Sequence, residues 1–112
     1  MIRIKADGKT IALIIKAKAQ INGFVTNPNN PLQLGYINFP EKHQVKPHQH
    51  RALTKTTHQN QEFIYVQSGR LAVTFFNKGQ SFVKHILNPG DCLLQLSGGH
   101  GFKFYSQRKL SQ

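Results

Sequence analysis

Three histidines and one glutamate in this sequence have the types and spacing of metal ligands. His48 and His50 are separated by one residue, so on a β-strand both imidazoles project from the same face. Imidazole suits zinc, copper, iron and nickel, and an added carboxylate extends the set to manganese. We therefore expect one divalent transition metal (Zn, Fe, Mn or Ni), held by His48, His50, Glu62 and His100.

The alternation of side chains along a strand predicts where these groups point. Glu62 has the same parity as Ile64 and Val66, an apolar pair expected to face the interior. The carboxylate is thus expected inside, near the mouth of the fold. His100 has the parity of Phe102 and Phe104, which predicts an inward face again. A buried carboxylate is costly unless a cation or several donors satisfy it, so this placement favours a metal.

The elements that would position these residues are strands. Hydrophobic periodicity is two, and turn signals such as Asp7-Gly8 and Ser68-Gly69 recur every eight to twelve residues. The expected strands cover 2–5, 10–16, 34–39, 62–66, 71–76, 82–87, 92–96 and 100–105, with an extended segment at 43–50. The one candidate helix is a short stretch at 16–20. The pattern predicts an all-β antiparallel barrel or sandwich.

Two turns near the candidate ligands have structural interpretations. Gly98-Gly99 is expected to permit a backbone bend that aims His100, rather than to bind phosphate. Asp91, in a Pro-Gly-Asp turn, is expected to cap its own turn through a bond from its side chain to the backbone.

Length and composition favour one domain in a reducing compartment. A chain of 112 residues is expected to form a single domain, 1–112, with its core at about 10–105 and a polar tail at 106–112. Cys92 is the only cysteine and lies in an apolar run, as a small core residue does. The apolar stretch at 11–15 is too short to cross a membrane. We expect no membrane association and a cytoplasmic location.

The charge balance is strongly basic. Fifteen Lys and Arg against four Asp and Glu give a formal net charge of +11. The basic residues are scattered singly, without a basic run, a zinc-finger spacing or an aromatic RNA-binding motif. Direct binding of nucleic acid is therefore not expected. A solvated basic surface that attracts a small anionic ligand is the preferred interpretation.

The candidate ligands stand in two motifs that resemble those of the cupin superfamily. His48-Gln49-His50, followed by Glu62 and then by Gly69 seven positions on, resembles the first cupin motif. Pro89-Gly90-Asp91 followed by His100 resembles the second, in which a Gly-Asp turn precedes the last histidine. In cupins these three histidines and the glutamate bind the metal. The resemblance implies the same role for His48, His50, Glu62 and His100.

The resemblance covers residues of about 10–105 and implies an antiparallel double-stranded β-helix, the jelly-roll barrel of cupins. The chain looks most like a group of small single-domain bacterial cupins of undefined activity, some of them associated with surface-sugar biosynthesis. The segments that carry this closer likeness are Leu32-Gln33-Leu34-Gly35-Tyr36, Lys46-Pro47-His48-Gln49-His50, Gln61-Glu62 and Ser97-Gly98-Gly99-His100-Gly101-Phe102. A homodimer is the family-level expectation, and symmetric dimers are the commonest oligomers in general.

The chain departs from the family pattern in three places. Eleven residues separate His50 from Glu62, where the usual motif has three or four. This insertion, 51–61, is expected to be a loop at the barrel mouth, and it contains His58 as an alternative metal ligand or a ligand-binding residue. The second motif lacks its usual proline, and Phe104 replaces its asparagine. After Tyr105 the chain becomes polar, so a different closure of the barrel and a covering partner subunit both stay open.

Two functions from different classes fit these features. The first is a divalent-metal-dependent enzyme acting on a small polar molecule such as a sugar or a keto acid. No catalytic residue beyond the metal ligands is assigned, and Tyr65 and His58 are candidates only. The alternative is a non-catalytic cupin module that binds or senses a small anionic ligand, such as a sugar phosphate or a nucleotide sugar. The fold alone does not choose between them.

Overall fold

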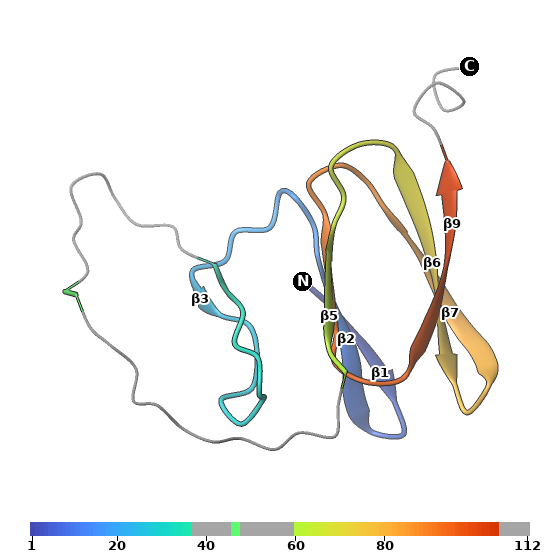
Figure 1. The fold of residues 1–112 in the computed structure, drawn as a ribbon, viewed down its shortest axis with the longest axis horizontal. Helices are drawn as coiled ribbons and strands as arrows, with labels where there is room; N and C mark the ends of the chain where they lie inside the picture. The colour runs from blue at the N-terminus through green and yellow to red at the C-terminus, as the bar shows by residue number, and fades with distance from the viewer. Residues whose placement is uncertain (37–45, 48–59, 106–112) are drawn as a thin grey trace. The chain divides into compact units, whose positions relative to one another are not determined.

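The computed structural model describes residues 1–36, 46–47 and 60–105. Within these ranges the chain forms strands and no helix, as the periodicity predicts. The strands are β1 (Ile2–Ala6), β2 (Lys9–Ile15), β3 (Gly23–Phe24), β4 (Gly35–Tyr36), β5 (Glu62–Tyr65), β6 (Arg70–Asn77), β7 (Gln80–Leu87), β8 (Cys92–Gln95) and β9 (Gly99–Tyr105) (Figure 1). The segment expected to be helical contains only a turn, closed by the Ala19 amide on the Lys16 carbonyl oxygen.

Contacts divide the chain into two compact units. The first unit is Met1–Ala19 with Gln59–Gln112, and the second is Gln20–His58. In the second unit β3 and β4 form a short antiparallel pair, Gly23 opposite Tyr36 and Phe24 opposite Gly35. The turn-rich segment between these strands is held by the Gln33 amide, which donates to the carbonyl oxygens of Asn27 and Asn30. The expectation that all 112 residues form one cupin domain stays a prediction.

The first unit consists of two antiparallel sheets that face each other. The strand orders are β1-β2-β8-β5 in one sheet and β7-β6-β9 in the other (Figure 1). Residues from both sheets form the apolar core, among them Ile14 and Leu93 from one and Val73 and Phe75 from the other. Among the described residues both sheets are open, and no strand closes them into a barrel. All-β antiparallel architecture is thus confirmed in its coarse form, whereas the cupin jelly roll stays a prediction.

The hairpins follow from their turn residues. Asp7 and Gly8 both have positive φ, 51° and 76°, in the turn that joins β1 to β2. Lys78 and Gly79 repeat this geometry between β6 and β7, with φ values of 53° and 78°. Two successive left-handed residues match the twist of the flanking strands in a two-residue hairpin. The Asp7-Gly8 hairpin was expected from the sequence, and its strands begin within one residue of the expected bounds.

One corner of the first unit is organised by Asp91, which is 3% exposed. Its carboxylate accepts hydrogen bonds from the Asn88 amide at 2.7 Å, the Ala17 amide at 2.8 Å and the Lys16 ammonium at 2.8 Å. The bond from Asn88 confirms that Asp91 caps its own turn. The bonds from Lys16 and Ala17 add a connection to the end of β2 that sequence spacing did not indicate.

Gly69, the glycine of the motif-one pattern, has a structural reason for lacking a side chain. Its φ is +77°, and a Cβ placed there would lie 2.9 Å from the carbonyl oxygen of Tyr105. A left-handed L-residue costs about 1–2 kcal/mol, and the backbone contact adds to that cost. We therefore expect Gly69→Ala to lower the free energy of unfolding, measured in urea, by about 2–3 kcal/mol.

Gly79→Ala is a matched control for this substitution. Gly79 has a nearly identical φ of +78°, but a Cβ there has nothing within 4 Å. Gly79→Ala should therefore lower the free energy of unfolding only by the conformational cost of about 1–2 kcal/mol. An equal decrease in the free energy of unfolding for the two variants would show that the contact with Tyr105 does not contribute to it.

No helix in the described part of the chain is long and apolar enough to cross a membrane.

Candidate metal centre

The candidate site begins with a row of residues across the sheet β1-β2-β8-β5. Gln95 at the end of β8 is opposite Ala12 on one side and Glu62 on the other. Opposite residues in antiparallel strands share a face, so the Gln95 amide and the Glu62 carboxylate both belong to the inner face. Glu62 shares this face with Ile64, which packs against the core. The predicted parity of Glu62 is confirmed.

The turn between β8 and β9 returns the chain toward this row. The Leu96 and Ser97 amides both donate to the carbonyl oxygen of Ile11, at 2.7 and 3.1 Å. Gly98 then has a φ of +75°, and a Cβ at that position would lie 3.2 Å from Ile11 Cδ1. A side chain there would be both strained and crowded. The expected bend before His100 is confirmed, and Gly98 supplies its left-handed residue.

His100 reaches both neighbours in the row. Its Nε2 lies 3.0 Å from Glu62 Oε1, and its Nδ1 lies 3.0 Å from Gln95 Oε1. The imidazole is 16% exposed, whereas the Glu62 side chain is 58% exposed. The pairing of β9 with β6 places His100 opposite Phe75, a residue of the core. Two of the four predicted ligands are therefore brought together, although they are 38 positions apart in the chain.

Aromatic rings follow His100 along β9. The Phe102 ring lies 4.5 Å from the imidazole, centroid to centroid, and the Phe104 ring lies 6.2 Å beyond it. The register confirms that these two side chains share the face of His100. Phe102 is nevertheless 37% exposed and Phe104 77% exposed. Parity predicted the direction of these side chains and not their depth, because β9 is an edge strand of its sheet.

The prediction of a buried Glu62 carboxylate is wrong for the same reason. β5 is also an edge strand, and Glu62 is its first residue. The carboxylate points along the predicted face but keeps contact with solvent. Desolvation of Glu62 is therefore not an argument for a metal, and the case depends instead on its contact with His100.

The chemistry of this pair fits two ligands of one divalent ion. Two ligands of one ion at about 2.1 Å lie about 3.4 Å apart in tetrahedral geometry and about 3 Å apart at the right angle of octahedral geometry. The separation of 3.0 Å between His100 Nε2 and Glu62 Oε1 is the length of an ordinary hydrogen bond or ion pair and is close to the octahedral value. A metal-ligating histidine also ordinarily gives its other ring nitrogen to a hydrogen-bond partner, and Gln95 is placed to accept that bond. The pair supplies one nitrogen and one oxygen donor of the kinds that bind divalent transition metals.

The remaining predicted ligands fall outside the described residues. His48, His50 and the alternative ligand His58 all belong to 48–59, which the structure does not describe. In the described ranges no group of three or more His, Cys, Asp or Glu side chains is arranged to hold a metal. Of the candidate general bases, Tyr65 is 59% exposed, on the opposite parity to Glu62.

Gln95 is the site residue that sequence reasoning missed. It is 2% exposed, and its Nε2 donates to the carbonyl oxygen of Ser97. A glutamine inside the apolar run that contains Cys92, Leu93 and Leu94 was the available signal, because buried amides need partners. Cys92 itself is 7% exposed, as expected of a core residue.

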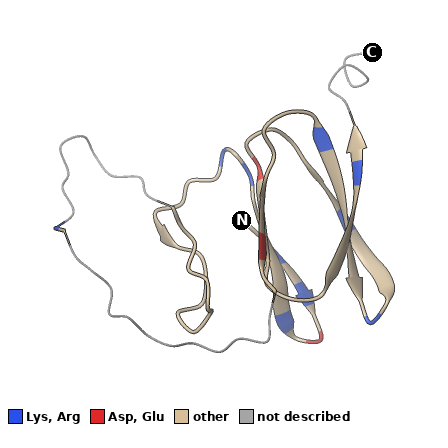
Figure 2. Cartoon of the chain, in the orientation of Figure 1, with Lys and Arg blue, Asp and Glu red and all other residues tan. Residues whose placement is uncertain are grey.

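Charged residues are spread over the first unit. Figure 2 shows Lys and Arg on several strands of both sheets, and the exposed ones include Arg3, Lys5, Lys9, Lys84 and Lys103. Only three described residues are acidic, namely Asp7, Glu62 and Asp91. Two of these have cationic partners, Lys78 for Asp7 and Lys16 for Asp91. Glu62 contacts a histidine instead.

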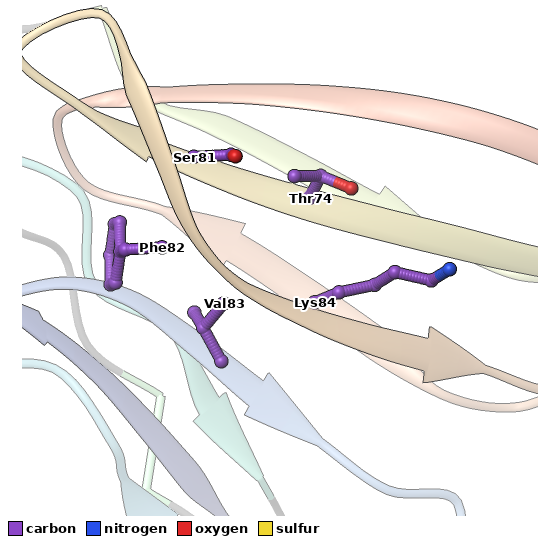
Figure 3. A pocket seen from close by; sticks show the side chains of 5 residues that line it. All are labelled: Thr74, Ser81, Phe82, Val83 and Lys84. Carbon is purple, nitrogen blue, oxygen red and sulfur yellow. The ribbon is translucent and has the colours of Figure 1, made fainter.

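One surface pocket lies on the sheet β7-β6-β9. It is lined by Thr74 from β6 and by the β7 residues Ser81, Phe82, Val83 and Lys84 (Figure 3). Among the described residues that line it, Lys84 is the only ionisable one, and neither Glu62 nor His100 is among them.

Comparison of the chain with protein-family models, with curated proteins and with solved structures found no match. The site is therefore defined by its own geometry, a histidine held between a buried amide and a carboxylate.

Proposed function

We propose that this protein is a small cupin-type jelly roll that binds one divalent transition metal and acts as a metal-dependent enzyme on a small polar molecule. The observation that carries the proposal is the 3.0 Å contact between His100 Nε2 and Glu62 Oε1. Sequence spacing supplies His48 and His50 as the further ligands, with His58 as the alternative. The facing antiparallel sheets of the first unit are the architecture that such a fold requires.

The residues of the site would perform separate tasks. Glu62 contributes the negative charge that favours a cation over a neutral ligand, and its exposure leaves the site open to small molecules. His100 contributes a nitrogen donor from a ring held on its other side. A divalent ion bound here would act as a Lewis acid on a substrate with vicinal oxygens, such as a sugar or a keto acid.

The basic composition favours a second candidate, a non-catalytic module for an anionic ligand. A net charge of +11 raises the local concentration of anions near the surface. Glucose 6-phosphate, UDP-glucose and pyruvate are suitable probes for both functions. In an enzyme, His50→Ala should remove both the metal and the turnover of the active probe. In a binding module the same variant should keep its affinity for the probe.

Elemental analysis tests whether a metal is present at all. The protein should be purified without an affinity tag that itself binds metal, and then measured by inductively coupled plasma mass spectrometry. We expect about one equivalent of Zn, Fe, Mn or Ni, or uptake of one equivalent when the metal-free protein is titrated. A protein that contains no transition metal and takes up none in the titration would contradict the proposal.

A further inference from the structure

The side-chain amide of Gln95 is buried, so it cannot replace its hydrogen bonds with bonds to water. Its side chain lies on the inner face of β8, in a residue 2% exposed. Its Nε2 donates to the Ser97 carbonyl oxygen, and its Oε1 lies 3.0 Å from His100 Nδ1. Leaving either end unpaired would cost about 1–3 kcal/mol, so both contacts constrain the site.

Ser97 fixes which end of the amide faces His100. A backbone carbonyl oxygen only accepts hydrogen bonds, so the NH₂ group of Gln95 must face it. Ser97 cannot easily move away, because its own amide donates to the Ile11 carbonyl oxygen at 3.1 Å. Turning the amide over would place two oxygens against each other in a buried position. The Gln95 oxygen is therefore the atom presented to the imidazole.

This orientation determines the proton on the imidazole. An amide oxygen only accepts, so His100 Nδ1 must carry a hydrogen and donate it. An imidazolium carries a hydrogen on Nε2 as well and can donate it to Glu62, whereas the neutral ring has a single N–H and keeps a lone pair on Nε2. Glu62 Oε1 lies 3.0 Å from this nitrogen, and a divalent ion bound to both atoms would lie to one side of the line that joins them. The Phe102 ring, 4.5 Å from the imidazole, covers one face of it.

Glu62 would favour the other tautomer, with the proton on Nε2. Its side chain is 58% exposed, so its carboxylate can turn to water instead. An exposed pair of this kind contributes about 0–1 kcal/mol, less than the about 1–3 kcal/mol lost by an unpaired buried amide. The contact with Gln95 is therefore the stronger of the two.

We propose that Gln95 is a positioning residue that holds His100 in the Nδ1–H tautomer and so directs the Nε2 lone pair, together with the Glu62 carboxylate, at one divalent cation. The binding of a cation rests on the proposed function, whereas the tautomer of His100 is a property of the metal-free protein. The two parts can therefore fail separately.

Nitrogen-15 NMR of the metal-free protein decides the tautomer. At a single pH of about 9, where an ordinary imidazole is neutral, we expect the His100 proton on Nδ1. In Gln95→Leu the acceptor is gone, and the proton should move to Nε2, facing Glu62. A wild-type proton on Nε2, or a tautomer unchanged in Gln95→Leu, would overturn the assignment. The wild-type measurement stands even if the variant does not fold.

Metal affinity provides the second readout, with Co²⁺ as the probe. Gln95→Leu should bind Co²⁺ about 10- to 100-fold more weakly than wild type, as is usual when the partner of a ligating histidine is removed. Leu93→Ala is the matched control, because Leu93 is buried on the same face of β8 and is opposite Ile64 rather than Glu62. An equal loss in Leu93→Ala would assign the effect to stability and overturn the positioning role. Failure of wild type to bind Co²⁺ would contradict the proposed function and leave the tautomer result standing.

Discussion

Asp91→Ala is expected to lower the free energy of unfolding by about 3–5 kcal/mol, a large part of the stability of a small domain, because a hydrogen bond to a charged acceptor contributes about 1.5–3 kcal/mol. The substitution removes an acceptor shared by the Asn88 amide, the Ala17 amide and the Lys16 ammonium. The Lys16 side chain is 42% exposed and can turn to water, so most of the loss comes from the two backbone amides. Urea unfolding measures it, and Asp91→Asn provides a milder variant that keeps the side-chain volume.

The same carboxylate should make the protein sensitive to acid. Burial alone would raise the pKa of Asp91, but the bonds from Asn88, Lys16 and Ala17 outweigh burial and hold the pKa below its ordinary value of 3.8. A carboxyl whose pKa is lower in the folded protein stabilises the fold fully above its unfolded value. That contribution is lost as the pH falls below about 4 and through the folded pKa. Stability measured from pH 6 downward should therefore decline, and Asp91→Asn should lack this part of the decline.

Asp7→Asn is the matched control for Asp91. Its ion pair with Lys78 is 3.5 Å long, and both side chains are mostly exposed, 60% for Asp7 and 81% for Lys78. Such a pair contributes at most about 1 kcal/mol. A loss in Asp7→Asn as large as that in Asp91→Asn would contradict the role given to burial and to the backbone amides.

His100→Ala is expected to weaken metal binding by more than about 100-fold, beyond the usual effect of removing an outer partner of a ligand. The variant removes the nitrogen donor that lies beside the Glu62 carboxylate. Glu62→Gln should have a comparable effect on Co²⁺ affinity, because it removes the negative charge while keeping the size of the side chain. Isothermal titration with Co²⁺ measures both variants.

His85→Ala controls for the loss of any imidazole. His85 lies on β7, where its ring packs edge-on to Phe75 at 6.4 Å. Its removal should lower stability slightly and leave Co²⁺ affinity unchanged. Equal weakening by His85→Ala and His100→Ala would show that the metal is not bound where the structure places Glu62 and His100 together.

Local features of the fold were predictable because they depend on neighbouring residues. The Asp7-Gly8 turn and the alternation that follows it define β1 and β2 almost to the residue. β3 was missed, since two residues, Gly23 and Phe24, are too few to show a period. The position of β8 between β2 and β5 was not predictable either, because strand order depends on contacts between distant parts of the chain.

The same difference between local features and long-range contacts applies to the candidate site. Parity correctly placed Glu62 and His100 on inward faces, because the alternation of side chains is a local property. It could not show that Glu62 stays exposed at the start of an edge strand. Nor could it show that the β8–β9 turn brings His100 back onto Gln95. His48, His50 and His58 stay predictions from spacing alone.

Paramagnetic NMR during a Co²⁺ titration of the metal-free, untagged protein tests most directly that Glu62 and His100 share one metal ion. We predict saturation at about one equivalent, with the largest effects on His100 and Glu62 and weaker effects on Gln95. Absence of any uptake, or effects centred on Asp7 or Asp91 instead, would contradict the account.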